Sequence, residues 1–214
     1  MDESAGSPER FGYEWAKYNE LRPDYEIQFR RWTPFFQPDD WRGKSVLDVG
    51  CGNGSLTARL ADAGFRAVGL EHAETGVQQA AKAFTQVEFR AHDINNPLPT
   101  DLRGRFDVVM AAEVIEHLYL PRQLFARARE ALAPGGLLLV TTPYHGYLKN
   151  LAIAVAGKFD HHWRPSWDHG HIKFFSRTTL SDMAVECGFR PVGFSRVGRI
   201  APLAKSMILT AKLV

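Results

Sequence analysis

The sequence predicts an α/β fold, a three-layer sandwich in which helices cover both faces of a mostly parallel sheet. Short apolar runs of strand type, beginning near residue 44, alternate with segments that carry apolar residues at helical spacing. The first run leads directly into a glycine-rich loop, an arrangement found where open α/β sheets bind ligands. Parallel neighbours need a crossover connection, usually a helix, so the alternation favours parallel strands.

Residues 1–40 are expected to form a helical cover over the cleft of the domain. Aromatic side chains recur there at helical spacing, in two groups on either side of Pro23. The groups are Phe11, Trp15 and Tyr18, and then Tyr25, Phe29, Trp32 and Phe36. Such stripes more often pack against the body of a protein than bind a substrate, so we predict a packing role for them.

Residues 41–142 are expected to hold five parallel strands and their crossover helices, and to bind the ligand. The strand-like runs read SVLDVG, AVGLE, VEFRAHD, FDVVMAA and GGLLLVTT in chain order. The intervening helices are predicted to turn inward Leu56 and Leu60, then Val77, Ala81 and Phe84, and then Leu124, Ala128 and Leu132. The sequence Pro134-Gly135-Gly136 is expected to stop the last of these helices.

Residues 143–176 interrupt the alternation, and we interpret them as a lid or substrate-binding insertion. This stretch is rich in aromatic residues and histidine, and only the part near 147–156 has a helical pattern. Residues 177–214 resume the alternation, with a helix expected from about Thr178 to Cys187 and two further strand-like runs. The 214 residues, 45% of them hydrophobic, are therefore predicted to form a single domain.

The charge balance argues against a dedicated nucleic-acid-binding protein. The net charge of +2 is far from the basic excess that drives binding to phosphates. Cys51 and Cys187 lie far apart and form no metal-ligand pair, which is typical of a reducing compartment. No signal-peptide pattern is present, and no apolar run approaches the roughly 20 residues that span a bilayer. We expect a cytoplasmic protein, and its oligomeric state stays open.

The loop after the first strand carries Gly50, Gly52 and Gly54 at alternate positions. Glycine lets a ligand lie against the backbone, and the helix N-terminus that follows offers unpaired N–H groups. A dinucleotide-binding loop has its third glycine one position later, where this chain has Ser55. The offset argues against NAD and favours a smaller adenosyl ligand.

The stretch VLDVGCGNG resembles the first motif of the class I S-adenosylmethionine-dependent methyltransferases, and LAPGGLLLVTT resembles their fifth-strand motif. Glu71 ends the second strand, where that family places an acid on the ribose hydroxyls, and Asp93 stands where a polar side chain meets the adenine. The resemblance implies a Rossmann-like, seven-stranded sheet with an antiparallel last strand, and S-adenosylmethionine as the cofactor. The cofactor-binding residues that it implies are Gly50, Cys51, Gly52, Asn53, Gly54, Glu71, His72, Asp93, Ile94, Ala112 and Glu113.

Within this class the chain is most similar to the O-methyltransferases of ubiquinone biosynthesis, from GKSVLDVGCGNG through EVIEHL. The similarity implies methyl transfer to a hydroxyl oxygen of a small-molecule or lipid-like acceptor. It also implies peripheral membrane contact through a lid helix, here 147–157. The arginine that this group carries before the first motif makes Arg30 a candidate to bind the cofactor's carboxylate. Trp163, Trp167 and the lid histidines depart from the pattern of the group, which leaves the acceptor open.

The sequence EVIEH, after the fourth strand, places Glu113, Glu116 and His117 at helical spacing where ligands of α/β sheets collect. In one interpretation Glu116 and His117 cap and pair locally, while Glu113 only lines the cofactor pocket. In a second, His117 or His171 takes the substrate proton while Glu116 orients the ring, so these three are the candidate catalytic residues. In a third, Glu113, Glu116 and His117, completed by His169 or His171, bind Mg²⁺, Mn²⁺ or Zn²⁺.

Two other functions remain open from the sequence. Metal-dependent RNA 2′-O-methyltransferases carry a similar Glu-x-x-Glu-His stretch, although a net charge of +2 gives RNA binding little support. A non-catalytic protein that keeps the cofactor fold is the other alternative, and the intact glycine loop with Glu71 and Asp93 argues against it. The prediction is therefore an enzyme, a methyltransferase that uses S-adenosylmethionine.

Overall fold

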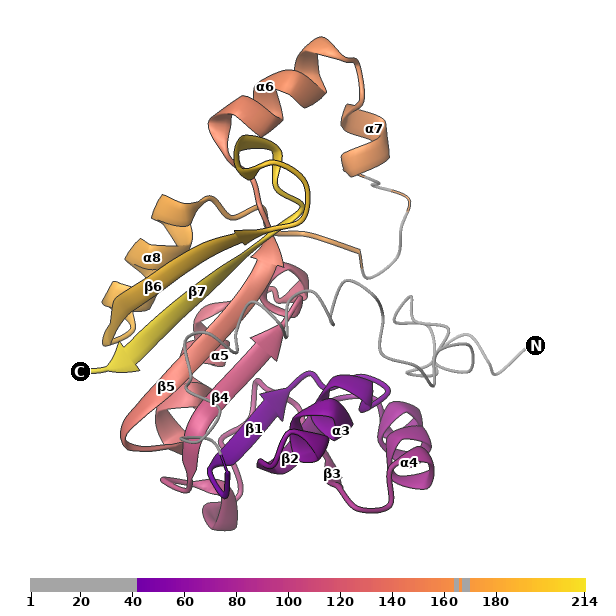
Figure 1. Cartoon of the computed structure of the whole chain (residues 1–214), viewed down its shortest axis with the longest axis vertical. Coiled ribbons are helices and arrows are strands. Elements are labelled where there is room, and N and C mark those ends of the chain that lie inside the picture. Colours follow the sequence, from indigo (N-terminus) through magenta and orange to yellow (C-terminus); the bar gives the residue numbers. More distant parts are fainter. Residues whose placement is uncertain (1–41, 164–165, 167–169) are drawn as a thin grey trace.

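A seven-stranded sheet forms the middle layer of the structure, a computed structural model that describes residues 42–163, 166 and 170–214 (Figure 1). Its strands lie in the order β3-β2-β1-β4-β5-β7-β6. They are β1 (Ser45–Val49), β2 (Arg66–Glu71), β3 (Glu88–Ala91), β4 (Phe106–Ala112), β5 (Leu132–Pro143), β6 (Phe189–Val197) and β7 (Ser206–Leu213). The predicted α/β fold and all seven predicted strands are confirmed.

The first five strands pair in parallel, and β7 runs antiparallel between β5 and β6. β1 is central to the parallel part, because Leu47 pairs with Val68 of β2 on one side and Val109 of β4 on the other. The carboxyl ends of β1, β2 and β4 therefore lie next to one another at one edge of the sheet. The antiparallel last strand agrees with the family resemblance.

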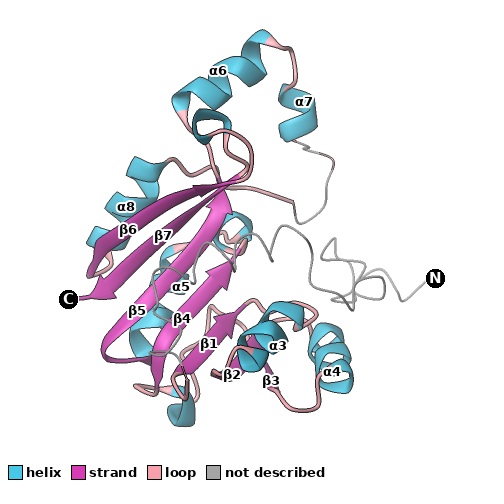
Figure 2. Ribbon diagram, in the orientation of Figure 1, coloured by secondary structure: helices cyan, strands magenta, loops and turns pink. Residues whose placement is uncertain are grey.

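Helices cover both faces of the sheet (Figure 2). Along β4, Val109 and Met110 belong to two different buried clusters, because successive side chains of a strand point to opposite faces. Leu124 of α5 and Leu180 of α8 complete one cluster, and Leu56 of α3 completes the other. The helices of these layers are α3 (Ser55–Asp62), α4 (Glu74–Ala83), α5 (Arg122–Ala131) and α8 (Arg177–Glu186). The predicted three-layer sandwich is thus present.

The predicted inward face of α4 is wrong by one residue. Ala81 is exposed, whereas Gly76 and Ala80 are buried. The reason is the close approach of α4 to the glycine loop: a Cβ on Gly54 would lie 2.7 Å from the Cβ of Ala80. Only small residues fit this contact, and a pattern search that follows large apolar side chains passes over them.

Leu132 was expected in the third crossover helix and instead begins β5, where it pairs with Phe106 of β4. α5 ends at Ala131, and Leu132 is buried at 4% exposure. Leu132 is therefore buried as predicted, although it lies in a strand and not in the predicted helix. Pro134, Gly135 and Gly136 lie within the strand, and the register of β4 and β5 shifts between Phe106 and Val108.

The segment after β5 carries α6 (Tyr147–Val155) and α7 (Phe159–His162), which lie beyond the end of the sheet (Figure 1). α6 matches the helix expected near 147–156, and α8 matches the helix expected near Thr178–Cys187. Within the described ranges, no helix is both long enough and apolar enough to cross a bilayer. The predicted helical cover over 1–40, with Arg30, lies outside the described residues, as do Trp167 and His169.

Candidate functional site

The loop between β1 and α3 holds its three glycines in the left-handed region, with φ of 74° at Gly50, 57° at Gly52 and 77° at Gly54. A Cβ on Gly50 would lie 2.6 Å from Cγ2 of Val114, and one on Gly54 would lie 2.6 Å from Cζ of Phe89. Gly50 and Gly54 are therefore required by the turn and by packing against protein side chains. In comparable loops the middle glycine is the one that lets backbone approach a ligand, and that position here is Gly52.

Glu71 ends β2 and turns its carboxylate toward the glycine loop. Oε2 accepts a hydrogen bond from the backbone N–H of Gly52 at 3.0 Å, and Oε1 accepts one from Ala73 N–H at 3.1 Å. The neighbouring His72 is exposed. An acceptor-only carboxylate at this place can receive the hydroxyl hydrogens of a ribose.

The other predicted loop residues stabilise local structure. Asn53 Oδ1 accepts from Ser55 N–H at 3.1 Å at the start of α3, and Cys51 is buried. Asp93 Oδ1 accepts from both the backbone N–H and the side-chain amide of Asn95, each at 2.9 Å. Ile94 packs against a buried cluster. These residues lie at the same edge of the sheet as the glycine loop.

Asp48, which was not among the predicted site residues, is a buried acid two residues before Gly50. It is 1% exposed, and its Oδ2 accepts a hydrogen bond from Thr57 Oγ1 at 2.7 Å. Burial raises the pKa of Asp48 to about 7, the Thr57 hydrogen bond opposes this rise, and the charge of Glu71 adds to it. The signal in the sequence is a single carboxylate inside the apolar run SVLDV.

Glu113 follows β4 in a left-handed backbone conformation, with φ of 56°, which costs about 1–3 kcal/mol for a residue other than glycine. Its backbone N–H donates to the carbonyl oxygen of Thr141 at 3.1 Å. Its Oε1 accepts from Thr141 Oγ1 at 2.9 Å, and its Oε2 accepts from Ser206 Oγ at 3.4 Å. Hydroxyls of β5 and β7 thus orient this carboxylate.

Glu116 is completely buried in a short 3₁₀ turn, Ile115–His117. Its Oε2 accepts from Thr142 Oγ1 at 3.0 Å, whereas its Oε1 has no hydrogen-bond partner among the residues that the structure describes. Nε2 of His171 lies 3.9 Å from this Oε1. Burial, and then the charge of Glu113, raise the pKa of Glu116 well above its usual value.

His117 and His171 meet beside Glu116. Their rings form a T-shaped contact with centroids 4.8 Å apart, and Nδ1 of His117 lies 3.3 Å from the carbonyl oxygen of Gly170. The backbone oxygen of Glu116 accepts from Ile172 N–H at 2.9 Å, which attaches the segment of His171 to this turn. Burial, and then the charge of His117, lower the pKa of His171 to about 4, so its imidazole is neutral at pH 7.

The three predicted catalytic residues therefore lie together: ligand atoms of Glu116, His117 and His171 are all within 4.8 Å of one another. Glu113 is not one of this group, and its carboxylate accepts hydrogen bonds from Thr141 and Ser206. The helix expected to unite Glu113 with the other two is a 3₁₀ turn that starts after Glu113. His171 joins through a long-range contact that spacing could not reveal.

Two further buried side chains, His145 and Lys149, lie just before and within α6. Burial, and then the charge of Lys149, lower the pKa of His145 to about 4, and its Nδ1 lies 3.4 Å from Oδ1 of Asn150. Lys149 is 6% exposed and donates from Nζ to the carbonyl oxygen of Lys205 at 3.3 Å. Lys149 was not among the predicted site residues, because its only local signal is a cation inside the apolar stretch YLKNLAIAV.

Comparison with known proteins gives a consistent family. A family model described as a methyltransferase domain matches residues 18–192. The ubiquinone biosynthesis O-methyltransferase of Cereibacter sphaeroides is 32% identical over 180 residues, which covers 82% of this chain and 71% of that protein. The ubiquinone biosynthesis O-methyltransferase of Idiomarina loihiensis is 28% identical over 204 residues, covering 92% of this chain and 82% of that protein.

A solved structure has the same fold. Magnesium protoporphyrin IX methyltransferase from Synechocystis PCC 6803, with bound SAH, matches with a TM-score of 0.65 over 89% of this chain and 82% of that one. The two sequences are 18% identical, so this likeness concerns the fold alone.

Proposed function

We propose that this chain methylates a hydroxyl oxygen of a small-molecule acceptor, because it belongs to the S-adenosylmethionine-dependent methyltransferases. The relatives named ubiquinone biosynthesis O-methyltransferase support an oxygen acceptor. The observation that carries the proposal is the cluster of Glu116, His117 and His171 after the carboxyl end of β4, in which Glu116 is buried and the two imidazoles are half-buried. An oxygen nucleophile must lose a proton, and this cluster supplies a proton acceptor.

The cofactor lies on the glycine loop in this proposal. S-adenosylmethionine supplies an already activated methyl group, so the protein has to align the acceptor and exclude water, and alignment can lower a barrier by roughly 7–11 kcal/mol. The backbone at Gly52 contacts the cofactor, because Gly50 and Gly54 pack against side chains of the protein itself. Glu71 exchanges its bond to Gly52 N–H for the ribose hydroxyls, which its position beside the loop supports.

His171 is the proton acceptor. Its imidazole is neutral at pH 7, since burial lowers its pKa to about 4, and it can therefore take a proton from a hydroxyl group. Glu116 is a positioning residue: its Oε1 faces Nε2 of His171 and has no other hydrogen-bond partner in the described part of the chain. His117 packs against the His171 ring and holds it from the other side.

Replacing the imidazole tests this assignment. His171→Asn should lower kcat by about 10²- to 10⁴-fold in methyl transfer from labelled S-adenosylmethionine to a catechol, while the affinity for S-adenosylhomocysteine stays unchanged. His161→Asn is the matched control, because His161 is exposed on α7. If the His171 variant has the same kcat as the control, His171 is not the proton acceptor.

A divalent ion at the same cluster is a second form of the proposal. One carboxylate oxygen and two imidazoles within 4.8 Å of one another make a mixed oxygen and nitrogen donor set, and Oε1 of Glu116 has no partner in the described residues. Such donors suit Zn²⁺ or Mn²⁺, and Mg²⁺ less well because it prefers oxygen. A bound ion would act as a Lewis acid that lowers the pKa of the acceptor hydroxyl.

Chelation distinguishes the two forms. If a metal ion is needed, EDTA should abolish turnover and leave cofactor binding nearly intact. Titration of the apo-protein with Zn²⁺ or Mn²⁺ in a calorimeter should then show a single site that Glu116→Gln weakens. Full activity in EDTA would refute the metal form of the proposal and leave the form in which an imidazole is the base.

Contact with a membrane is a further part of the proposal, and it would suit a lipid-like acceptor. α6 exposes Tyr147 at 79% and Val155 at 82%, together with Leu148 and Leu151. An exposed apolar helix face can lie in the interfacial region of a bilayer. Sedimentation with phospholipid vesicles tests this: wild-type protein should pellet with them, and a Leu148→Ser/Leu151→Ser variant should not.

A further inference from the structure

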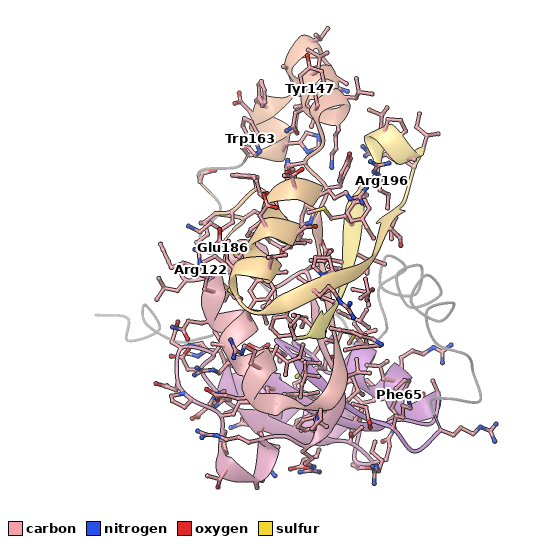
Figure 3. All side chains as sticks on the ribbon, turned by 90° about the vertical axis from the view of Figure 1, so that its left-hand side faces the viewer. Phe65, Arg122, Tyr147, Trp163, Glu186 and Arg196 are labelled. Carbon is pink, nitrogen blue, oxygen red and sulfur yellow. The ribbon has the colours of Figure 1, made fainter. Side chains whose placement is uncertain are left out.

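Lys149 is oriented opposite to what the composition of its helix suggests. α6 exposes Tyr147, Leu148 and Val155, whereas the charged Lys149 is 6% exposed. Figure 3 shows Tyr147 on α6 at the top of the view and Arg196 of β6 below it. A buried ammonium costs free energy unless an anion or several acceptors compensate it. The inward position of Lys149 therefore calls for a partner.

The described part of the chain supplies a weak partner for this ammonium. Nζ donates to one backbone carbonyl, that of Lys205, at 3.3 Å, and no Asp or Glu forms an ion pair with it there. Arg199 and Lys205 are cations that act on Lys149, and Glu113 is the carboxylate that opposes them. Burial, and then Arg199, lower the pKa of Lys149 to about 8, so the group is still mostly protonated at pH 7. The local charge balance is positive.

The ammonium lies at the acceptor side of the proposed site. Lys205, whose carbonyl oxygen holds Nζ, precedes Ser206, and Ser206 Oγ donates to Oε2 of Glu113. His145 also lies in this region: the charge of Lys149 lowers the pKa of His145, and the charge of His145 lowers the pKa of His171. Lys149 thus shares one neighbourhood with Glu113 and the His171 cluster.

We propose that Lys149 binds a carboxylate of the methyl acceptor and so selects hydroxy acids over neutral hydroxyl compounds. This inference rests on the proposed function, because it assigns a specificity residue to the same reaction. The acceptor's anion takes the place that an Asp or Glu would occupy in a permanently paired lysine. Charge-assisted hydrogen bonds of this kind are roughly twice as strong as neutral ones, which provides the selection.

A pair of catechols that differ in one charge tests the inference. Binding of caffeate and of methyl caffeate is measured by calorimetry with S-adenosylhomocysteine present, so that no reaction takes place. Wild-type protein should bind caffeate more tightly, and Lys149→Met should lose about 10- to 100-fold of that affinity while binding of the ester stays unchanged. Lys149→Arg should retain the preference for caffeate. Lys158→Met is the matched control, an exposed lysine of the same lid, and should behave as wild type.

A purely structural Lys149 would behave differently. Its loss would lower the melting temperature and weaken both catechols equally, because the bond from α6 to Lys205 would be broken. Under the proposal, Lys149→Met keeps or raises the melting temperature, since a buried unpaired charge is replaced by an apolar chain of similar volume. Equal affinities of the wild type for the two catechols would overturn the inference. Methylation assayed separately on both compounds tests the proposed function, which fails only if neither is methylated.

Discussion

Adding one methyl group at Gly50 should perturb both stability and cofactor binding, and its cost can be worked out from the geometry. Alanine at φ of 74° costs about 1–2 kcal/mol, because its Cβ crowds the following carbonyl oxygen. The same Cβ would lie 2.6 Å from Cγ2 of Val114, and relief of such overpacking costs typically another 1–3 kcal/mol. Gly50→Ala should therefore lower the free energy of unfolding by about 2–5 kcal/mol, a large part of a typical total.

Gly104 provides the matched control for this prediction. Its φ is 61°, and a Cβ there would have no atom within 4 Å, so Gly104→Ala carries only the backbone cost of about 1–2 kcal/mol. Urea unfolding of both variants gives the two free energies, and calorimetry with S-adenosylhomocysteine should show weaker binding for Gly50→Ala alone. Val114→Ala combined with Gly50→Ala should recover part of the packing cost. If the two alanine variants lose equal stability, the steric explanation of the glycine loop is wrong.

Three further predictions concern buried and exposed charges. The folded state binds the Asp48 proton more tightly than the unfolded chain does, because the pKa of Asp48 is raised to about 7. The free energy of unfolding should therefore fall as the pH rises from about 4 to about 7. The expected loss is up to about 4 kcal/mol, at 1.36 kcal/mol per pH unit. Urea titrations of Asp48→Asn should lack this slope, and an unchanged slope would contradict the raised pKa. Thr142→Val removes the hydroxyl whose hydrogen bond lowers the pKa of Glu116, so the rising limb of the pH–kcat profile should move to higher pH. A limb that stays at the wild-type pH would exclude Glu116 from the reaction. Arg122→Ala should leave the free energy of unfolding nearly unchanged, because Arg122 and Glu186 form an exposed ion pair (Figure 3), and a clear drop in the melting temperature would refute this.

Local periodicity was sufficient for most of the fold. Apolar runs such as SVLDV and FDVVMAA are buried strands because a strand covered on both faces cannot contain many polar residues. The glycine spacing likewise indicated the loop, since three left-handed positions in five residues leave few alternatives to glycine. The direction of β7 came from family resemblance, because alternation along a strand is the same whichever way the strand runs.

The sequence alone thus determined which segments are strands, where the glycine loop lies, and that Glu116 and His117 follow the fourth strand. The tertiary structure decided which other side chains reach that place. His171 is brought to Glu116 by backbone hydrogen bonds between residues more than fifty positions apart, Lys149 is turned inward by the packing of α6, and α4 is buried on its smallest residues. The physical reason is that periodicity records the environment of each element separately, whereas contacts between distant segments depend on volumes and charges that meet only after folding.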